Sequence, residues 1–190
     1  MPGVKLTYED LVRLPDDGMR HELIDGEHFV TPKPMARHQL IAGDLQSTLH
    51  QYVKEHGLGW IVADTDFRID DFSVVEPDIA FVPDELTDGL DIDEVLRITP
   101  ALIVEVSSPS TRRYDQTVKR DFYASIKVQE YWFVDVPATS VWIYRRQPDT
   151  SSFDAPVVVS DPDAVVATPL IPGLSLRLAD IFTIRRRERR

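Results

Sequence analysis

The sequence predicts a single α/β domain, because helical and strand patterns both occur within 190 residues, the length of one ordinary domain. From Ala36 to His56 apolar residues recur at spacings of three to five, which is typical of one helix face, and Gly57 follows where the helix should end. Residues 101–107 are almost wholly apolar, as in a strand buried on both faces. Residues 114–126 return to helical spacing, and we place Val118, Phe122 and Ile126 on the packed side.

A short helix and a hairpin are predicted before the long helix. Thr7 and Asp10 have the spacing of a capping box, and the helix that they begin should end near Leu14. Strand-like runs at 21–24 and 27–30 flank Asp25-Gly26. An Asp-Gly pair favours a tight hairpin turn because both residues tolerate positive φ angles.

The remaining strands are predicted from short apolar or alternating runs. They lie at 60–63, 66–69, 78–82, 131–136 and 140–146, with two weaker strands after residue 147. Residues 83–100 are acidic and predict a loop with a short helix. In the run 140–146, Val141 and Ile143 should face one side of the sheet, and Trp142 and Tyr144 the other.

The charge distribution divides the chain into an acidic body and a basic end. The net charge is −11, but residues 185–190 read RRRERR. We therefore predict one domain at 1–184 and a basic C-terminal tail at 185–190, which is most simply a solvated charge run. A negative surface repels phosphate backbones, so contact with nucleic acid would need a local basic patch or bridging metal ions.

Composition excludes several classes of chemistry. With no cysteine, the chain has no disulfides, thiolate zinc sites, iron–sulfur clusters or cysteine nucleophiles. The sequence contains no HExxH, GxxxxGK[ST], GxGxxG or GxSxG motif, so there is no support for a metalloprotease, a P-loop, a dinucleotide site or a serine hydrolase. No secretion signal or membrane span is apparent, so we expect a soluble cytoplasmic protein with no membrane partner.

Three acidic residues stand in or beside predicted strands. They are Glu22, Asp78 and Glu105. An ionised carboxylate in an apolar environment is unfavourable by several kcal/mol unless it is paired or binds metal. If the strands around Asp78 and Glu105 are neighbours, the two carboxylates are natural ligands for Mg²⁺. The alternative for Glu105 is an ion pair with a nearby basic side chain.

Lys119 has two interpretations. Asp115 lies four residues before it, so the pair could be a surface contact of about 0.2–0.5 kcal/mol on a helix. Alternatively, its ammonium group lies beside the metal-binding acids, where it would help to activate water or stabilise charge on a phosphate. Gln116 and Tyr123 would then line the same face.

Taken in order, several motifs resemble a large bacterial family catalogued as putative restriction endonucleases. This family was formerly a domain of unknown function and belongs to the PD-(D/E)XK nuclease superfamily. The motifs are HELIDGE at 21–27, HQ at 38–39, EPDIAFV at 76–82, IVEVSSPST at 103–111, Asp115, Lys119 and EYWFVD at 130–135. The resemblance extends from about residue 7 to residue 182.

The resemblance implies a restriction-endonuclease-like mixed β-sheet flanked by helices, with an N-terminal β-hairpin and a C-terminal antiparallel extension. It also implies Mg²⁺-dependent endonuclease activity on phosphodiester bonds, expected in DNA, with Mn²⁺ as a substitute. Asp78 and Glu105 match the two metal-binding acids, and Glu22 matches an acid that assists the metal. These residues and Lys119 are the predicted catalytic set.

The sequence departs from the pattern at two places. The lysine usual in the superfamily would fall at position 107, where this chain has Ser107. The resemblance implies that in this family the lysine has moved to the next helix, and Lys119 matches that position. The second departure is Lys127 before Val128, where the family usually has glycine, and we expect it to lengthen the helix.

A second function stays open on the same fold. Ser107 and the net negative charge would also suit a catalytically inactive domain that acts as a binding or assembly module. We also expect a homodimer, because the 131–144 hairpin carries aromatic residues that could be exposed.

Overall fold

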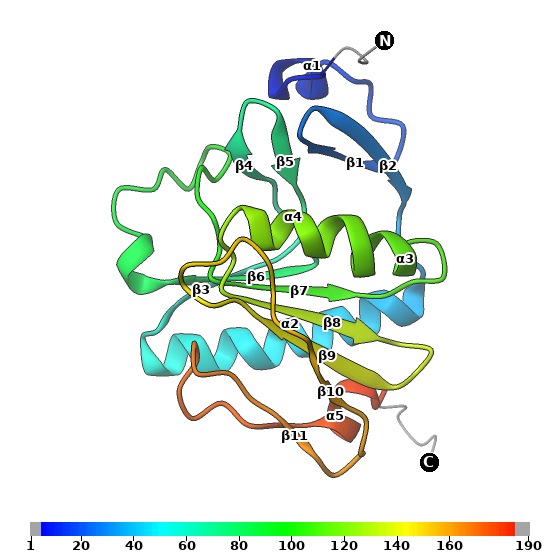
Figure 1. Cartoon of the computed structure of the whole chain (residues 1–190), viewed down its shortest axis with the longest axis vertical. Helices are drawn as coiled ribbons and strands as arrows, with labels where there is room; N and C mark the ends of the chain where they lie inside the picture. Colours follow the sequence, from blue (N-terminus) through cyan, green and yellow to red (C-terminus); the bar gives the residue numbers. More distant parts are fainter. Residues whose placement is uncertain (1–4, 185–190) are drawn as a thin grey trace, which may run out of the picture.

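The computed structural model describes residues 5–184, and its centre is a mixed six-stranded sheet in the order β10-β9-β8-β7-β6-β3 (Figure 1). Its strands are β3 (Gly59–Val62), β6 (Ile79–Pro83), β7 (Leu102–Val106), β8 (Glu130–Asp135), β9 (Ser140–Arg145) and β10 (Val157–Val159). All neighbours are antiparallel except β7 and β8, which are parallel. The mixed sheet is thus confirmed.

Helices cover both faces of this sheet (Figure 1). The long helix α2 (Ala36–His56) lies on one face, as predicted. The other face carries one continuous helical segment that makes the crossover between the parallel strands β7 and β8. This segment consists of α3 (Arg112–Tyr114), the π-helix η2 (Asp115–Lys119) and α4 (Arg120–Ser125).

A four-stranded sheet in the order β2-β1-β5-β4 lies beyond α4 (Figure 1). Its strands are β1 (Met19–Ile24), β2 (Glu27–Pro32), β4 (Phe67–Asp70) and β5 (Ser73–Val75). The hairpin predicted around Asp25-Gly26 is its β1–β2 pair, and Thr7 caps α1 (Tyr8–Val12) with the predicted capping box. The sequence analysis missed β5, whose three residues are too few for a periodic signal.

The C-terminal extension consists of short elements packed below α2. They are β11 (Val165–Val166), β12 (Leu176–Arg177) and α5 (Leu178–Phe182). The 3₁₀-helix η1 (Asp84–Leu86) is not part of this extension and lies in the acidic loop after β6. The antiparallel pairing of β11 with β12 confirms the predicted extension. None of the helices in residues 5–184 has the length and hydrophobicity that a membrane span needs. The predicted basic tail lies outside the described residues.

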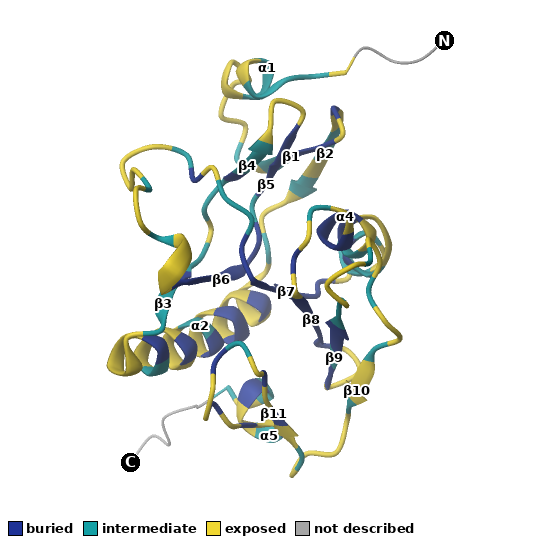
Figure 2. Ribbon diagram, turned by 60° about the vertical axis from the view of Figure 1, so that its left-hand side comes forward, coloured by how far each residue is buried: buried dark blue, intermediate teal, exposed yellow. Residues whose placement is uncertain are grey.

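The six-stranded sheet separates two hydrophobic clusters. One lies between the sheet, α2 and the C-terminal extension, and includes Val141 and Ile143. The other lies between the sheet, α4 and the small sheet, and includes Tyr144 with Trp142 packed against it. Figure 2 shows the buried residues along the central strands and on the inward faces of α2 and α4. The predicted alternation along β9 is therefore confirmed.

Two expectations about the crossover helix are wrong. Val118 is 37% exposed and not packed, because the π-helix widens the turn and rotates it outward. Lys127 does not lengthen the helix: α4 ends at Ser125, and Lys127 takes a left-handed φ of 75° that terminates it.

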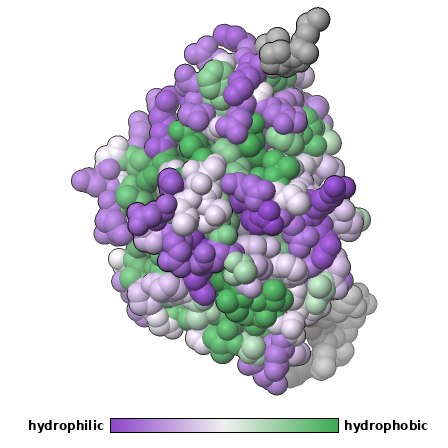
Figure 3. All heavy atoms as spheres, viewed as in Figure 1, coloured by the Kyte–Doolittle hydropathy of each residue, from purple (hydrophilic) through white to green (hydrophobic). Residues whose placement is uncertain are grey.

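The aromatic residues of the second hairpin do not form an exposed patch. Tyr131, Trp132 and Phe133 are fully buried within the chain, so the expected exposure of these aromatic residues is wrong, and the homodimer stays a prediction. Exposed apolar side chains lie instead on the edge strand β10, at Val157 and Val158. Figure 3 shows a hydrophobic area in the lower part of the face where Figure 1 places this strand.

Candidate active site

Asp78 and Glu105 come together because β6 and β7 are antiparallel neighbours. Ile79 pairs with Val104, so Asp78, just before β6, lies beside Glu105 near the end of β7. Oδ2 of Asp78 accepts a hydrogen bond of 2.8 Å from the N–H of Val106. Asp78 and Glu105 are 4% and 2% exposed. Two buried carboxylates from distant parts of the sequence therefore share one site at the edge of this strand pair.

Lys119 reaches Glu105 from the crossover helix. Its Nζ lies 2.9 Å from Oε1 of Glu105 and 2.9 Å from Oε1 of Glu22. The hydroxyl of Tyr123, one turn further along, donates a 2.6 Å hydrogen bond to the same Glu105 oxygen. The surface-pair interpretation of Lys119 with Asp115 is wrong, since both are buried. The alternative given for Glu105, an ion pair with a nearby basic side chain, is present in the structure, with Lys119 as the cation.

Glu22 enters the site from the small sheet. Its Oε1 also accepts a hydrogen bond of 3.0 Å from the N–H of Glu76, in the segment between β5 and β6. Its other oxygen, Oε2, is buried and has no hydrogen-bond partner among the described residues. A buried carboxylate oxygen without a donor is costly, so Glu22 has capacity for one more ligand.

Asp78 has partners that the sequence analysis did not assign. Nη1 of Arg20 donates a 3.0 Å hydrogen bond to Oδ1, and Nε2 of His38 lies 2.9 Å from Oδ2. Arg20 could have been found from the two-residue period of β1, which puts it on the same strand face as Glu22. His38 belongs to the HQ motif at 38–39, but nothing in its spacing connects the start of α2 with residue 78.

The site contains more negative than positive groups among the described residues. The carboxylates that interact electrostatically are Glu22, Asp64, Asp66, Glu76, Asp78, Glu105 and Asp115, and the permanent cations are Arg20 and Lys119. Burial raises the pKa of Glu105 to about 8, despite Lys119, and the pKa of Asp115 to about 6. The nearby carboxylates hold the pKa of Lys119 well above its usual value, although burial opposes this.

Asp78 behaves in the opposite way. Burial alone would raise its pKa, but the hydrogen bond with His38, the charge of Arg20 and the Val106 N–H lower it to about 2. Asp78 is therefore the ionised acid of the pair, and Glu105 is the one that burial pushes toward protonation.

The donor chemistry fits a hard divalent cation. Carboxylate oxygens are the ligands that Mg²⁺ prefers, the cluster has an excess of negative groups, and Oε2 of Glu22 lacks a donor. In the part of the chain that the structure describes, however, no three His, Asp or Glu side chains converge closely enough to hold a metal. The oxygens of Asp78 already accept hydrogen bonds from Arg20 and Val106. A cation would therefore have to compete with Arg20 and the Val106 N–H for the oxygens of Asp78.

Ser107 has a structural role in the position of the usual lysine. It is 3% exposed, and its Oγ accepts a 3.0 Å hydrogen bond from the N–H of Val136 after β8. A lysine at position 107 would remove this hydrogen bond.

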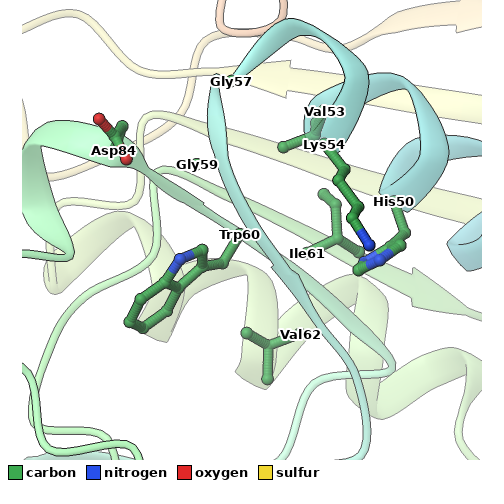
Figure 4. Close-up of a pocket in the computed structure, with 9 residues that line it drawn as sticks. All are labelled: His50, Val53, Lys54, Gly57, Gly59, Trp60, Ile61, Val62 and Asp84. Atoms are coloured by element: carbon green, nitrogen blue, oxygen red, sulfur yellow. The ribbon is translucent and has the colours of Figure 1, made fainter.

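A pocket of about 480 Å³ lies elsewhere, between the C-terminal end of α2 and the edge strand β3. Figure 4 shows His50 and Lys54 pointing into it from the helix and Trp60 beside it on the strand. None of the predicted catalytic residues lines this pocket.

The profile of the Uma2 family, described as "Putative restriction endonuclease", matches residues 8–179, which is most of the chain. The chain belongs to the Uma2 family. All four predicted catalytic residues fall within the residues that match the Uma2 profile.

A solved structure similar to this Uma2 chain is described as a putative nuclease belonging to DUF820 from Anabaena variabilis ATCC 29413. The two share 22% sequence identity with a TM-score of 0.79, over 93% of this chain and 97% of the other. At this identity the likeness establishes the fold. No curated protein matches the chain.

Proposed function

We propose that this protein is a Mg²⁺-dependent endonuclease that hydrolyses phosphodiester bonds in DNA, with Asp78 and Glu105 as the metal ligands. The observation that carries the proposal is the position of Asp78 against the backbone of β7, with its Oδ2 2.8 Å from the N of Val106, directly after Glu105. Membership of the Uma2 family supports the reaction class.

Bound between these carboxylates, Mg²⁺ would act as a Lewis acid on a phosphoryl oxygen. Lys119 would stabilise negative charge on the phosphate, and the position of its ammonium group at Glu105 supports this role. Glu22 holds this ammonium from the other side, and Tyr123 holds the carboxylate of Glu105. Together they restrict the orientation of both groups, which is how positioned side chains lower a reaction barrier.

The test is cleavage of supercoiled and linear DNA, with single-stranded DNA and RNA as further substrates, by purified protein with Mg²⁺ or Mn²⁺. Asp78→Asn and Glu105→Gln should each abolish cleavage, with circular dichroism verifying that the fold is retained. Asp84→Asn is the matched control, since Asp84 is an exposed acid of η1 outside the cluster. Retention of wild-type cleavage in the Asp78 and Glu105 variants would refute the proposal.

One observation favours the alternative of a catalytically inactive binding or assembly module. Both oxygens of Asp78 and Oε1 of Glu105 already contact groups of the protein, which leaves fewer free oxygens for a metal ion. If the protein cleaves none of these substrates and calorimetry detects no Mg²⁺ or Mn²⁺ binding at millimolar concentrations, this alternative replaces the nuclease proposal.

A further inference from the structure

Arg20 joins three carboxylates with three different nitrogens. Nη1 lies 3.0 Å from Oδ1 of Asp78, Nη2 lies 3.0 Å from Oδ1 of Asp64, and Nε lies 3.4 Å from Oε1 of Glu76. A guanidinium group is planar and rigid, so its nitrogens can bind separate acceptors at the same time. Loss of one of these contacts would leave the other two in place.

The three carboxylates differ in their exposure to solvent. The side chain of Asp78 is 3% exposed, that of Glu76 is 25% exposed and that of Asp64 is 58% exposed, while Arg20 itself is 13% exposed. The guanidinium group therefore lies between the buried end of the cluster and the surface. A short outward movement would exchange its contact with Asp78 for fuller contact with Asp64 and Glu76.

The two oxygens of Asp78 are not equally available to a metal ion. Oδ2 accepts from the Val106 N–H, a backbone donor fixed in β7, and also contacts His38. Oδ1 is contacted by Arg20. A Mg²⁺ ion lies about 2.1 Å from a carboxylate oxygen. At Oδ1 it would be within a few ångströms of the guanidinium charge, and the two cations would repel each other strongly in a buried site.

We infer that Arg20 is a displaceable counter-ion, which competes with the divalent cation for Oδ1 of Asp78 and is received by Asp64 and Glu76 when the cation binds. The inference rests on the metal site of the proposed function. It adds Arg20 as a positioning residue that sets the affinity for metal, and Asp64 as the residue that makes displacement favourable.

Calorimetric titration of the full chain with Mg²⁺ and with Mn²⁺ tests the competition. Arg20→Met should bind either cation at least ten-fold more tightly than the wild type. The matched control is Arg68→Met, because Arg68 lies in the same small sheet, has a 12% exposed side chain and pairs with Asp71. Arg68→Met removes the same charge and should leave the affinity unchanged. Equal affinities of wild type and Arg20→Met would overturn the inference.

A double-mutant cycle distinguishes displacement from a general effect of charge. Asp64→Asn should weaken Mg²⁺ binding several-fold in the wild type but have little effect in the Arg20→Met background, because Asp64 acts by receiving Arg20. If the effects of the two substitutions on Mg²⁺ affinity are additive, each residue acts on the metal ion only through its own charge and not through the contact between Arg20 and Asp64. That result would refute the proposal. Asp71→Asn, on the control pair, should not weaken binding.

The outcomes separate this inference from the proposed function. If neither the wild type nor Arg20→Met binds Mg²⁺ or Mn²⁺, both proposals fail. If the wild type binds metal and cleaves DNA but Arg20→Met binds no more tightly, only the role of Arg20 fails. Should Arg20→Met not fold, the exposed Asp64→Asn variant decides: unchanged Mg²⁺ affinity relative to Asp71→Asn would overturn the role of Arg20.

Discussion

Nζ of Lys119 lies 2.9 Å from Oε1 of Glu105, a contact that connects a π-helix with the end of a buried strand. The same ammonium group contacts Glu22 from the small sheet at 2.9 Å. Lys119 is thus the point at which the crossover helix, the six-stranded sheet and the four-stranded sheet are joined by charge. Its removal should affect stability as well as any catalysis.

Lys119→Met should destabilise the protein by about 3–5 kcal/mol, because it leaves Glu105 and Glu22 without their cation in a buried site. Urea unfolding followed by circular dichroism would measure the change. Lys54→Met, at an exposed position of α2, should change stability by less than about 0.5 kcal/mol. Similar effects of the two substitutions would contradict a structural role of the buried ammonium group.

Two tyrosines of the crossover segment, Tyr114 in α3 and Tyr123 in α4, offer a matched test of the hydrogen bond to Glu105. Tyr123→Phe removes the hydroxyl that donates to Glu105 and should cost about 1.5–3 kcal/mol. The hydroxyl of Tyr114 is buried without a partner among the described residues, so Tyr114→Phe should be neutral or slightly stabilising. The urea midpoints of the two variants measure this difference in stability. An equal loss of stability in Tyr123→Phe and Tyr114→Phe would contradict the prediction.

The pKa of Glu105 gives the protein a specific pH dependence. Because burial raises this pKa from 4.5 to about 8, the folded state binds the proton more strongly than the unfolded state. The contribution to stability is therefore complete below about pH 4.5 and declines as the pH rises toward 8, by at most about 1.4 kcal/mol per pH unit.

Glu105→Gln should remove this decline. The measurement is urea unfolding at several pH values between 4.5 and 8 in the presence of a chelator. An unchanged slope in the variant would show that another group is responsible.

Asp78 should act with the opposite sign: its lowered pKa of about 2 stabilises the fold above pH 3.8, and this stabilisation is lost as the pH falls toward 2.

Lys127 is a site where glycine should stabilise the protein. Its φ of 75° is in the left-handed region, which costs a residue with a side chain about 1–2 kcal/mol. Lys127→Gly should therefore raise the free energy of unfolding by about 0.5–1 kcal/mol, after the greater unfolded-state entropy of glycine is subtracted. Lys127→Ala is the control, since it removes the side chain but keeps the strain, and thermal unfolding should show no gain for it.

The elements of the fold could be predicted where one residue pattern continues for long enough. The helix 36–56, the buried strand around Glu105 and the hairpin at Asp25-Gly26 all have strong local periodicity or turn chemistry, and the structure contains each of them. The three-residue strand β5 and the π-helix that ends at Lys119 were missed because neither has a local pattern that distinguishes it. Exposure of Val118 follows from the π-helix and was missed with it.

The acids of the candidate site were also visible in the sequence, because a charge such as Glu105 inside an apolar strand is costly and needs an explanation. One of the two interpretations of Lys119 also put its ammonium group beside these acids, as the structure does. Local pattern could not show that Arg20 would be the partner of Asp78, since fifty-eight residues separate them. That contact depends on the packing of the small sheet against β6 and β7. Strand identity is set by neighbouring residues along the chain, whereas the pairing of buried charges is set by which strands meet in three dimensions.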